Sequence, residues 1–174
     1  MPGWRGHGVL QLPVPPLEDF VRGGTSHYDP SFLGQPGPAG ESFVHAHLTL
    51  LGPFDVLPAS ERVRRALQGH GPVRFWLRRL DTFPNGIIHA VPEPDDGARG
   101  LTAVLRREFP EVLPYRGEFP VRPHVTLDAV GPGIDEDWVR TATSRVLPVL
   151  VVADRVDLVW YESGGTRLVE TFSL

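Results

Sequence analysis

The sequence has no cysteine and no long apolar run. The absence of cysteine excludes disulfide bonds, thiolate metal sites and a cysteine nucleophile. No stretch reaches about 18 apolar residues, so we expect no membrane-spanning helix. The first residues, Met1 to His7, also lack the apolar core that is typical of a secretory signal peptide. These absences favour a cytoplasmic protein that does not associate with membranes.

An excess of basic residues is also missing. The chain carries 17 basic and 21 acidic residues, which gives a net charge of −4. Proteins that grip long nucleic acids usually present a basic face, so we expect no strong binding of long RNA or DNA. Small nucleotides and RNA ends remain suitable partners. The length of 174 residues and the hydrophobic content of 41% predict one folded domain over residues 1–174.

Glycine and proline are abundant, with 19 of each, and they divide the chain into short segments. Residues 24–41 are rich in glycine, proline and serine and are predicted to form a loop. Asn85-Gly86 and Gly164-Gly165 are typical of tight hairpin turns. Helical spacing predicts short helices after Pro15-Pro16, from a Ser60 cap, over 97–108 and from an Asp135 cap. Alternating apolar residues and apolar runs predict strands at 8–14, 43–51, 73–80, 87–91, 121–129, 150–161 and 166–173.

The order of these elements predicts an α+β fold. The two hairpins favour antiparallel pairing over a doubly wound parallel sheet. One pattern occurs twice: a strand with His-x-Thr, then a capped helix, then a hairpin. His124 follows His47 by 77 residues (124 − 47), which is nearly half of the chain. This spacing predicts two related lobes, each of which contributes one His-x-Thr strand.

The two His-x-Thr motifs lie on the polar faces of their strands. Residues i and i+2 of a strand point to the same side, so His47 and Thr49 present an imidazole and a hydroxyl next to each other. His124 and Thr126 do the same. If the two strands face each other across a cleft, two imidazoles and two hydroxyls surround one small anion.

This set of groups fits the cleavage of a phosphate ester. A neutral histidine can take a proton from water or from a ribose hydroxyl, and a protonated histidine can give a proton to the leaving oxygen. Threonine hydroxyls can donate hydrogen bonds to the non-bridging phosphate oxygens. We therefore predict His47 and His124 as catalytic residues and Thr49 and Thr126 as phosphate ligands. No metal or other cofactor is required, and the base and acid roles are left open.

The two motifs, His47-Leu48-Thr49-Leu50 and His124-Val125-Thr126-Leu127, resemble the paired motifs of the 2H phosphoesterase superfamily. The similarity covers roughly residues 8–173 and is closest to the 2′-5′ RNA ligase and cyclic phosphodiesterase-like branch. Supporting segments are Gly52-Pro53-Phe54, Thr82-Phe83-Pro84 and Arg122-Pro123.

That resemblance implies a bilobal, pseudo-two-fold fold, with antiparallel sheets lining a central cleft and short helices outside. It also implies metal-independent cleavage of 2′,3′-cyclic phosphates or 2′-5′ linkages, and ligation would be the reverse reaction.

Several neighbours of the motifs are secondary candidates. His45 and Arg122 lie on the faces of His47 and His124 and are possible substrate contacts. Many relatives carry a basic residue after the second motif, whereas this chain has Asp128, which could orient the site or repel a polyanion. The other histidines show no partner pattern, so we interpret them as structural or exposed: His7, His27, His70 and His89.

Two alternatives remain open. His45, His47 and a distant His124 have the spacing of a three-histidine zinc site, but a zinc site leaves both threonines unexplained. The second alternative is a non-catalytic module that binds nucleotides or RNA ends with the same fold.

Overall fold

The protein is described here from a computed structural model, which covers residues 5–23, 44–162 and 165–174. The predicted loop at 24–41 and Gly164 of the predicted last turn lie outside these residues. The strands are β1 (His7–Pro13), β2 (His47–Phe54), β3 (Val73–Thr82), β4 (Ile87–Glu93), β5 (Val125–Ala129), β6 (Val149–Ala153), β7 (Arg155–Glu162) and β8 (Gly165–Ser173).

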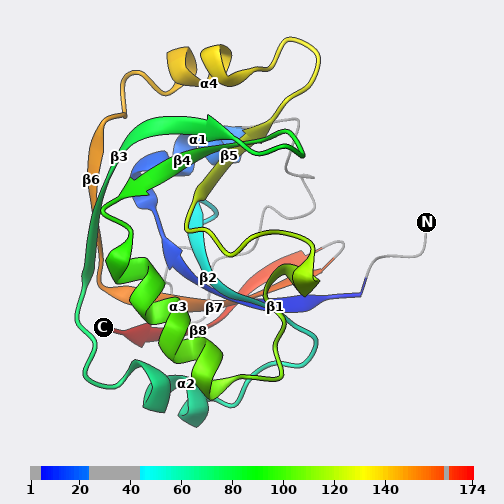
Figure 1. Cartoon of the computed structure of the whole chain (residues 1–174), viewed down its shortest axis with the longest axis vertical. Coiled ribbons are helices and arrows are strands. Elements are labelled where there is room, and N and C mark those ends of the chain that lie inside the picture. Colours follow the sequence, from blue (N-terminus) through cyan, green and yellow to red (C-terminus); the bar gives the residue numbers. More distant parts are fainter. Residues whose placement is uncertain (1–4, 24–43, 163–164) are drawn as a thin grey trace.

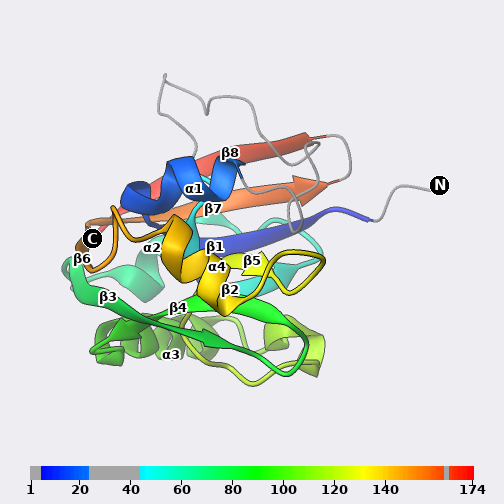
Figure 2. The same cartoon turned by 90° about the horizontal axis from the view of Figure 1, so that it is seen from above.

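All eight strands form one sheet in the order β6-β3-β4-β5-β2-β1-β7-β8, and every neighbouring pair is antiparallel. The sheet is curled into a half-barrel (Figures 1 and 2). Its middle lies between β5 and β2, so each four-stranded half ends on one His-x-Thr strand. The prediction of an α+β fold with antiparallel pairing is confirmed.

The described residues also form four short α-helices. They are α1 (Glu18–Gly23), α2 (Ser60–Leu67), α3 (Asp96–Glu108) and α4 (Glu136–Ala142). Figure 1 shows α2 and α3 side by side at one end of the molecule and α1 and α4 toward the other end. Helix α3 packs against β2 and β3, whereas α1 lies near β5 and α4 near β3.

The predicted caps have different outcomes. The Asp135 cap is confirmed, because the Trp138 backbone N–H donates to the Asp135 carboxylate over 2.8 Å. The Ser60 cap is wrong: Ala59 is the capping residue and Ser60 is the first helical residue. The Ser60 hydroxyl instead donates to Glu170, so it ties α2 to β8.

Two predicted strands are shorter than expected for identifiable reasons. The strand predicted from Phe43 begins at His47, because the Glu18 carboxylate accepts the backbone N–H groups of His45 and Ala46. The strand predicted from Val121 begins at Val125, since Pro123 has no N–H to give to a ladder.

The strand predicted over 150–161 is two strands. β6 pairs with β3, whereas β7 pairs with β1 and β8. The chain therefore leaves one edge of the sheet at Asp154 and joins the other half. Apolar runs of this length predict extended structure but do not predict its partners.

The core lies directly beneath the two motif strands. Leu48, Leu50, Val125 and Leu127 are 0–3% exposed, as the alternation predicted. Their burial fixes the strand faces, because a shift of register by one residue would expose all four. Among the described residues, no helix is long and apolar enough to cross a membrane.

Candidate active site

The two motifs meet through one backbone pairing. Leu48 of β2 is the partner of Val125 of β5 in an antiparallel arrangement. Extended by one residue on each side, this register sets His47 opposite Thr126 and Thr49 opposite His124. Directly opposed residues share a face, with Cβ atoms about 4.5–5.5 Å apart. Each imidazole is thus paired with the threonine of the other motif.

This arrangement differs from the predicted one in an important way. The motif strands do not face each other across a cleft but lie side by side in the middle of the sheet. The four polar side chains are partly exposed while their apolar neighbours are buried. The motifs therefore present two imidazoles and two hydroxyls on a single surface of the curled sheet.

Both histidines are oriented in the same way. Nδ1 of His47 lies 2.6 Å from the carbonyl oxygen of His45, and Nδ1 of His124 lies 2.7 Å from that of Arg122. A carbonyl oxygen can only accept, so each Nδ1 carries a hydrogen and donates it. In the neutral ring, Nε2 then has no proton and is free to act as a base.

Glu18 holds the segment behind His47. Its carboxylate accepts the backbone N–H of His45 over 2.7 Å and contacts the His45 ring nitrogen Nδ1 over 2.8 Å. His45 is only 2% exposed, so its side chain offers little surface to a substrate. Its position is instead suited to aiming its carbonyl oxygen at His47.

The environment disfavours a positive charge on either motif histidine. The pKa of His47 is lowered from its ordinary value near 6.5 to about 4, mainly because the ring is removed from solvent. The hydrogen bond to the His45 carbonyl raises this pKa, and the nearby His124 lowers it. Burial also lowers the pKa of His124. Both rings are therefore neutral near pH 7 when the site is empty.

His89, which the sequence pattern led us to interpret as structural or exposed, is buried next to the second motif. It is the β4 partner of Thr126, it is 1% exposed, and its ring centroid lies 5.4 Å from that of His124. Phe83 stacks on His89 at 3.9 Å and meets His124 edge-on at 4.9 Å. Its proximity to His124 follows from the pairing of β4 with β5, which the sequence pattern does not show.

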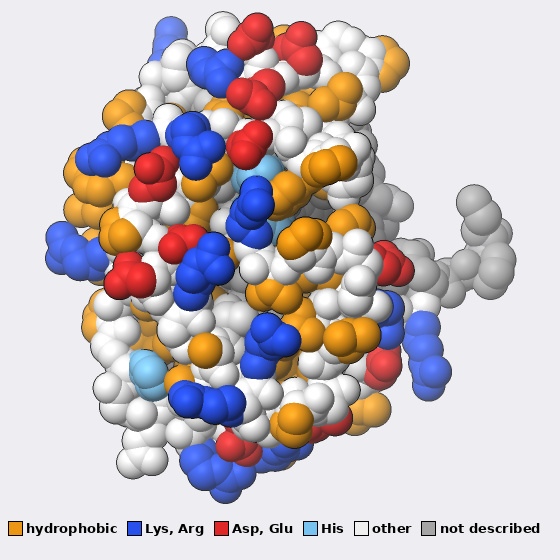
Figure 3. Space-filling view, in the orientation of Figure 1, with side chains coloured by type: hydrophobic (Ala, Val, Ile, Leu, Met, Phe, Trp, Pro, Cys, Tyr) orange, Lys and Arg blue, Asp and Glu red, His pale blue; other side chains and the backbone are white. Residues whose placement is uncertain are grey.

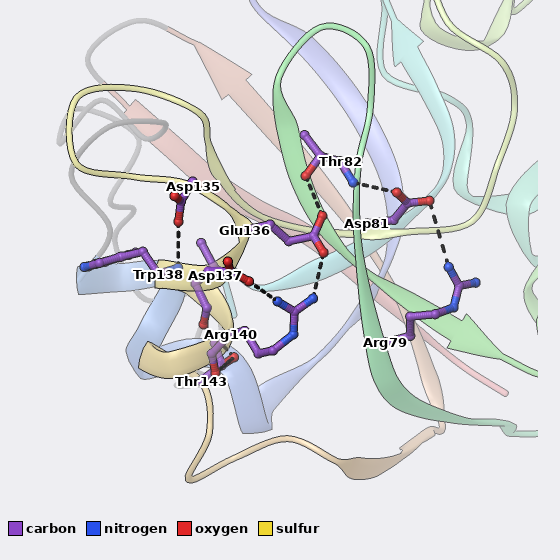
Figure 4. Close-up of polar contacts among 10 residues, drawn as sticks. Arg79, Asp81, Thr82, Asp135, Glu136, Asp137, Trp138, Arg140 and Thr143 are labelled. Carbon is purple, nitrogen blue, oxygen red and sulfur yellow. Dashed lines mark hydrogen bonds and ion pairs between the residues drawn. The ribbon is translucent and has the colours of Figure 1, made fainter.

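Helix α4 supports this aromatic group from the side. The Thr82 hydroxyl donates to Glu136 over 2.8 Å, and Arg140 in turn binds Glu136 over 2.7 Å (Figure 4). Thr82 is the last residue of β3 and directly precedes Phe83. These contacts fix the end of β3 and, with it, the ring that packs on His89 and His124.

Tyr115 borders the site on the other side. Its ring centroid lies 6.2 Å from that of His124, and its hydroxyl is hydrogen bonded to Thr49. Burial raises the pKa of Tyr115 to about 12, so the phenol stays protonated. Tyr115 and Arg116 have φ values of 50° and 53°, in the left-handed region that residues with a Cβ rarely adopt. Such strained backbone is often found where a side chain must be aimed at a site.

The remaining candidates lie at different depths. Arg122 is exposed, and its guanidinium lies 6.0 Å from the Phe83 ring, at the rim of the site. Asp128 is 1% exposed and accepts the backbone N–H of Ala129 over 2.8 Å. Its carboxylate is therefore below the surface that a substrate would reach.

The zinc alternative needs three histidines that converge. Within residues 5–23, 44–162 and 165–174, no group of three or more His, Asp or Glu side chains is arranged to hold a metal ion. The His45 ring nitrogen Nδ1 instead contacts the Glu18 carboxylate. The predicted three-histidine spacing therefore does not produce a three-histidine cluster.

Comparison with solved structures gives the same fold. E. coli LigT complexed with 3′-AMP has a TM-score of 0.56 at 15% identity, covering 98% of this chain and 99% of that one. E. coli LigT complexed with NADP+ has a TM-score of 0.53 at 20% identity, covering 99% and 98%. TT0787 of Thermus thermophilus has a TM-score of 0.53 at 19% identity, covering 97% of each chain. A search of curated proteins finds no significant match.

The curled antiparallel sheet with one His-x-Thr motif on each central strand defines the chain as a 2H phosphoesterase. The sequence profile of the 2′-5′ RNA ligase superfamily matches residues 13–165. The chain therefore belongs to the 2′-5′ RNA ligase superfamily, as the resemblance of the two motifs predicted.

Proposed function

We propose that the protein is a metal-independent phosphodiesterase that acts on 2′,3′-cyclic phosphates or 2′-5′ linkages of nucleotides and RNA ends. The observation that carries the proposal is the reciprocal pairing of the motifs, with His47 opposite Thr126 and His124 opposite Thr49. Each imidazole turns Nε2 away from its backbone hydrogen bond, and each is flanked by a hydroxyl donor.

These groups can complete a hydrolysis without any added reagent. One histidine takes a proton from water through Nε2 while the water oxygen bonds to phosphorus. The other histidine, as imidazolium, gives a proton to the ribose oxygen as its bond to phosphorus breaks. Thr49 and Thr126 donate to the non-bridging oxygens, whose charge grows in the transition state. Each proton transfer contributes roughly 10²–10⁴-fold to the rate.

The depressed pKa values of the histidines give the substrate itself a role. One ring must be protonated, yet both favour the neutral form in the empty site. A phosphate anion placed between the rings raises their pKa values, because an opposite charge favours the imidazolium. Substrate binding thus supplies the general acid by drawing a proton to one histidine.

The similar structures support a phosphate-bearing nucleotide as the ligand class. E. coli LigT has been crystallised in complex with 3′-AMP, with ATP, with NADP+ and with phosphate. A ligand of this chemistry fits two imidazoles and two hydroxyls on one surface. Ligation to a 2′-5′ bond would be the reverse of cleavage through the same groups.

Hydrolysis of 2′,3′-cyclic AMP, followed by chromatography of the 2′- and 3′-monophosphates, tests the proposal. We expect turnover that is unchanged by a chelator. Turnover that disappears with chelator and returns with zinc would overturn the metal-independent mechanism. Tight binding of 3′-AMP without turnover of cyclic phosphates or 2′-5′ linkages would instead support the non-catalytic binding module.

A further inference from the structure

A pocket of about 150 Å³ adjoins the paired motifs, between α3 and the turn at Pro114–Gly117. Thr49 and Tyr115 form part of its wall. Both also border the candidate active site, since Tyr115 is hydrogen bonded to Thr49 and lies near His124. A ligand that reaches past Thr49 from the paired histidines would therefore enter this pocket.

The pocket is lined by three arginines and by no acidic residue. Arg99 and Arg106 are seven residues apart on α3, so they lie two turns apart on one side of the helix, about 10 Å along its axis. Arg122 approaches from the segment before β5. In Figure 3, basic side chains gather over the middle of the face that α3 covers, next to a histidine.

The arginines of this region differ in whether they form salt bridges. Arg62 and Arg65 are bound to Glu108, and Arg99 is bound to Asp95 over 2.7 Å. Arg106 and Arg122 make no salt bridge to any residue in the part of the chain that the structure describes. Within those described residues, two guanidinium groups are thus left without a carboxylate partner at a pocket of about 150 Å³, which has room for a small anion.

The side-chain type also points to a particular ligand. The chain contains no lysine, so all 17 of its basic residues are arginines. The planar guanidinium fork matches the spacing of phosphate oxygens and can bind two of them at once. Thr102, one turn from Arg99 and Arg106, also lines the pocket, but its hydroxyl is occupied by the carbonyl of Leu50. The arginines are therefore the side chains that would bind a phosphate in this pocket.

We propose that this pocket is a second phosphate site, which holds the neighbouring internucleotide phosphate of the substrate while the paired motifs hold the reacting one. This rests on the proposed function and narrows it: the preferred substrate is a short oligonucleotide end that carries two phosphates. A net charge of −4 agrees with local recognition of an end rather than with electrostatic capture of a long polyanion.

Equilibrium binding tests the proposal without relying on turnover. Calorimetry would compare the diadenosine ligand ApAp with the same molecule in which an uncharged methylphosphonate replaces the internucleotide phosphate. We expect the native ligand to bind about tenfold more tightly, which is the range for a charge-assisted hydrogen bond. In Arg106→Gln this preference should disappear. Arg107→Gln is the matched control, because Arg107 is the next residue of α3 and is exposed outside the pocket, and it should keep the preference.

The outcomes separate the two proposals. The second phosphate site would be overturned if the wild-type protein bound both ligands with equal affinity. It would also be overturned if Arg106→Gln and Arg107→Gln lost the preference for ApAp to the same extent. Both conclusions hold even if 2′,3′-cyclic AMP is hydrolysed. An Arg106-dependent preference in a protein that hydrolyses neither cyclic phosphates nor 2′-5′ linkages would support the second site and overturn the phosphodiesterase. If Arg106 contributes to the binding of pyrophosphate but not of ApAp, the assignment to an oligonucleotide is wrong.

Discussion

Leu48 and Val125 are backbone partners across the middle of the sheet. Both side chains are fully buried, so the pairing is stabilised by the core rather than by the polar groups it positions. The same pairing brings each catalytic candidate next to the threonine of the other motif. The geometry of the site is therefore maintained by two apolar residues that would never touch a substrate.

Replacement of either motif histidine tests the acid and base roles. His47→Gln and His124→Gln should each lower kcat for 2′,3′-cyclic AMP by about 10²–10⁴-fold, because each removes one proton transfer. His70→Gln, at an exposed position, is the control and should be near normal. Circular dichroism should show an intact fold in all three variants. A near-normal rate for either motif variant would contradict the mechanism.

The threonines should act mainly on the transition state. Thr126→Val keeps the shape of the side chain but removes the hydroxyl, so kcat should fall by about 10²-fold, as for the loss of one oxyanion donor. Thr141→Val, on the exposed side of α4, provides the comparison. A change in KM alone, with kcat retained, would show that the hydroxyl binds substrate and transition state equally.

The pH dependence of kcat/KM follows from the lowered pKa values. This parameter reports the free enzyme, in which the pKa of His47 is about 4 and that of His124 lies below 6.5. The form with one neutral and one protonated ring is therefore populated on the acidic side of neutrality. We expect kcat/KM to be highest between about pH 4 and 6.5 and to decline above that range, whereas kcat should remain high to higher pH because bound phosphate raises both pKa values. A maximum of kcat/KM above pH 8 would contradict this.

The same shift predicts a change in stability. Between pH 6.5 and about 4 the unfolded chain protonates His47 and the folded chain does not, so the free energy of unfolding falls as the pH is lowered through this window. A pKa lowered from 6.5 to about 4 corresponds to about 3 kcal/mol at full effect. Denaturant titrations at pH 7 and pH 4 should show a smaller loss for His47→Gln than for the wild type. Equal losses would show that folding does not lower the pKa of His47.

Glu18 should affect catalysis only through the histidine it helps to orient. Glu18→Ala leaves the N–H of His45 without its acceptor and should cost about 1–3 kcal/mol of stability. It should also lower kcat with little change in KM, because the carbonyl of His45 then aims His47 less accurately. Glu18→Gln, which keeps one acceptor oxygen, should recover part of kcat. Asp19→Ala, at the exposed neighbouring position, is the control for the lost charge. A fall in stability with unchanged kcat would limit Glu18 to a structural role.

Much of this site could be predicted from local sequence. Period-two alternation fixed which side chains of 47–50 and 124–127 point outward, because burial of Leu48, Leu50, Val125 and Leu127 permits only one orientation. The two hairpin turns predicted antiparallel pairing, and the repeated motif predicted one motif strand in each half. These features depend only on short-range patterns and on composition.

What could not be predicted depends on contacts between distant segments. His45 lies outside β2 because its backbone N–H donates to Glu18, which lies 27 residues earlier in the sequence. The proximity of His89 to His124 depends on the pairing of β4 with β5, which no spacing in the sequence reveals. The division of the strand predicted over 150–161 likewise depends on which half of the sheet each segment joins.

The boundary between the two halves of the sheet, where β2 lies next to β5, has a consequence for ligand binding. Among the described residues, β2 and β5 share one backbone pairing, whereas β1 and β2 share five. A phosphate that accepts hydrogen bonds from both Thr49 and Thr126 would add a bridge where the backbone supplies few. Bound substrate would then link the two halves of the sheet. Because a ligand that binds only the folded state stabilises it, saturation with a phosphate ligand should raise the melting temperature.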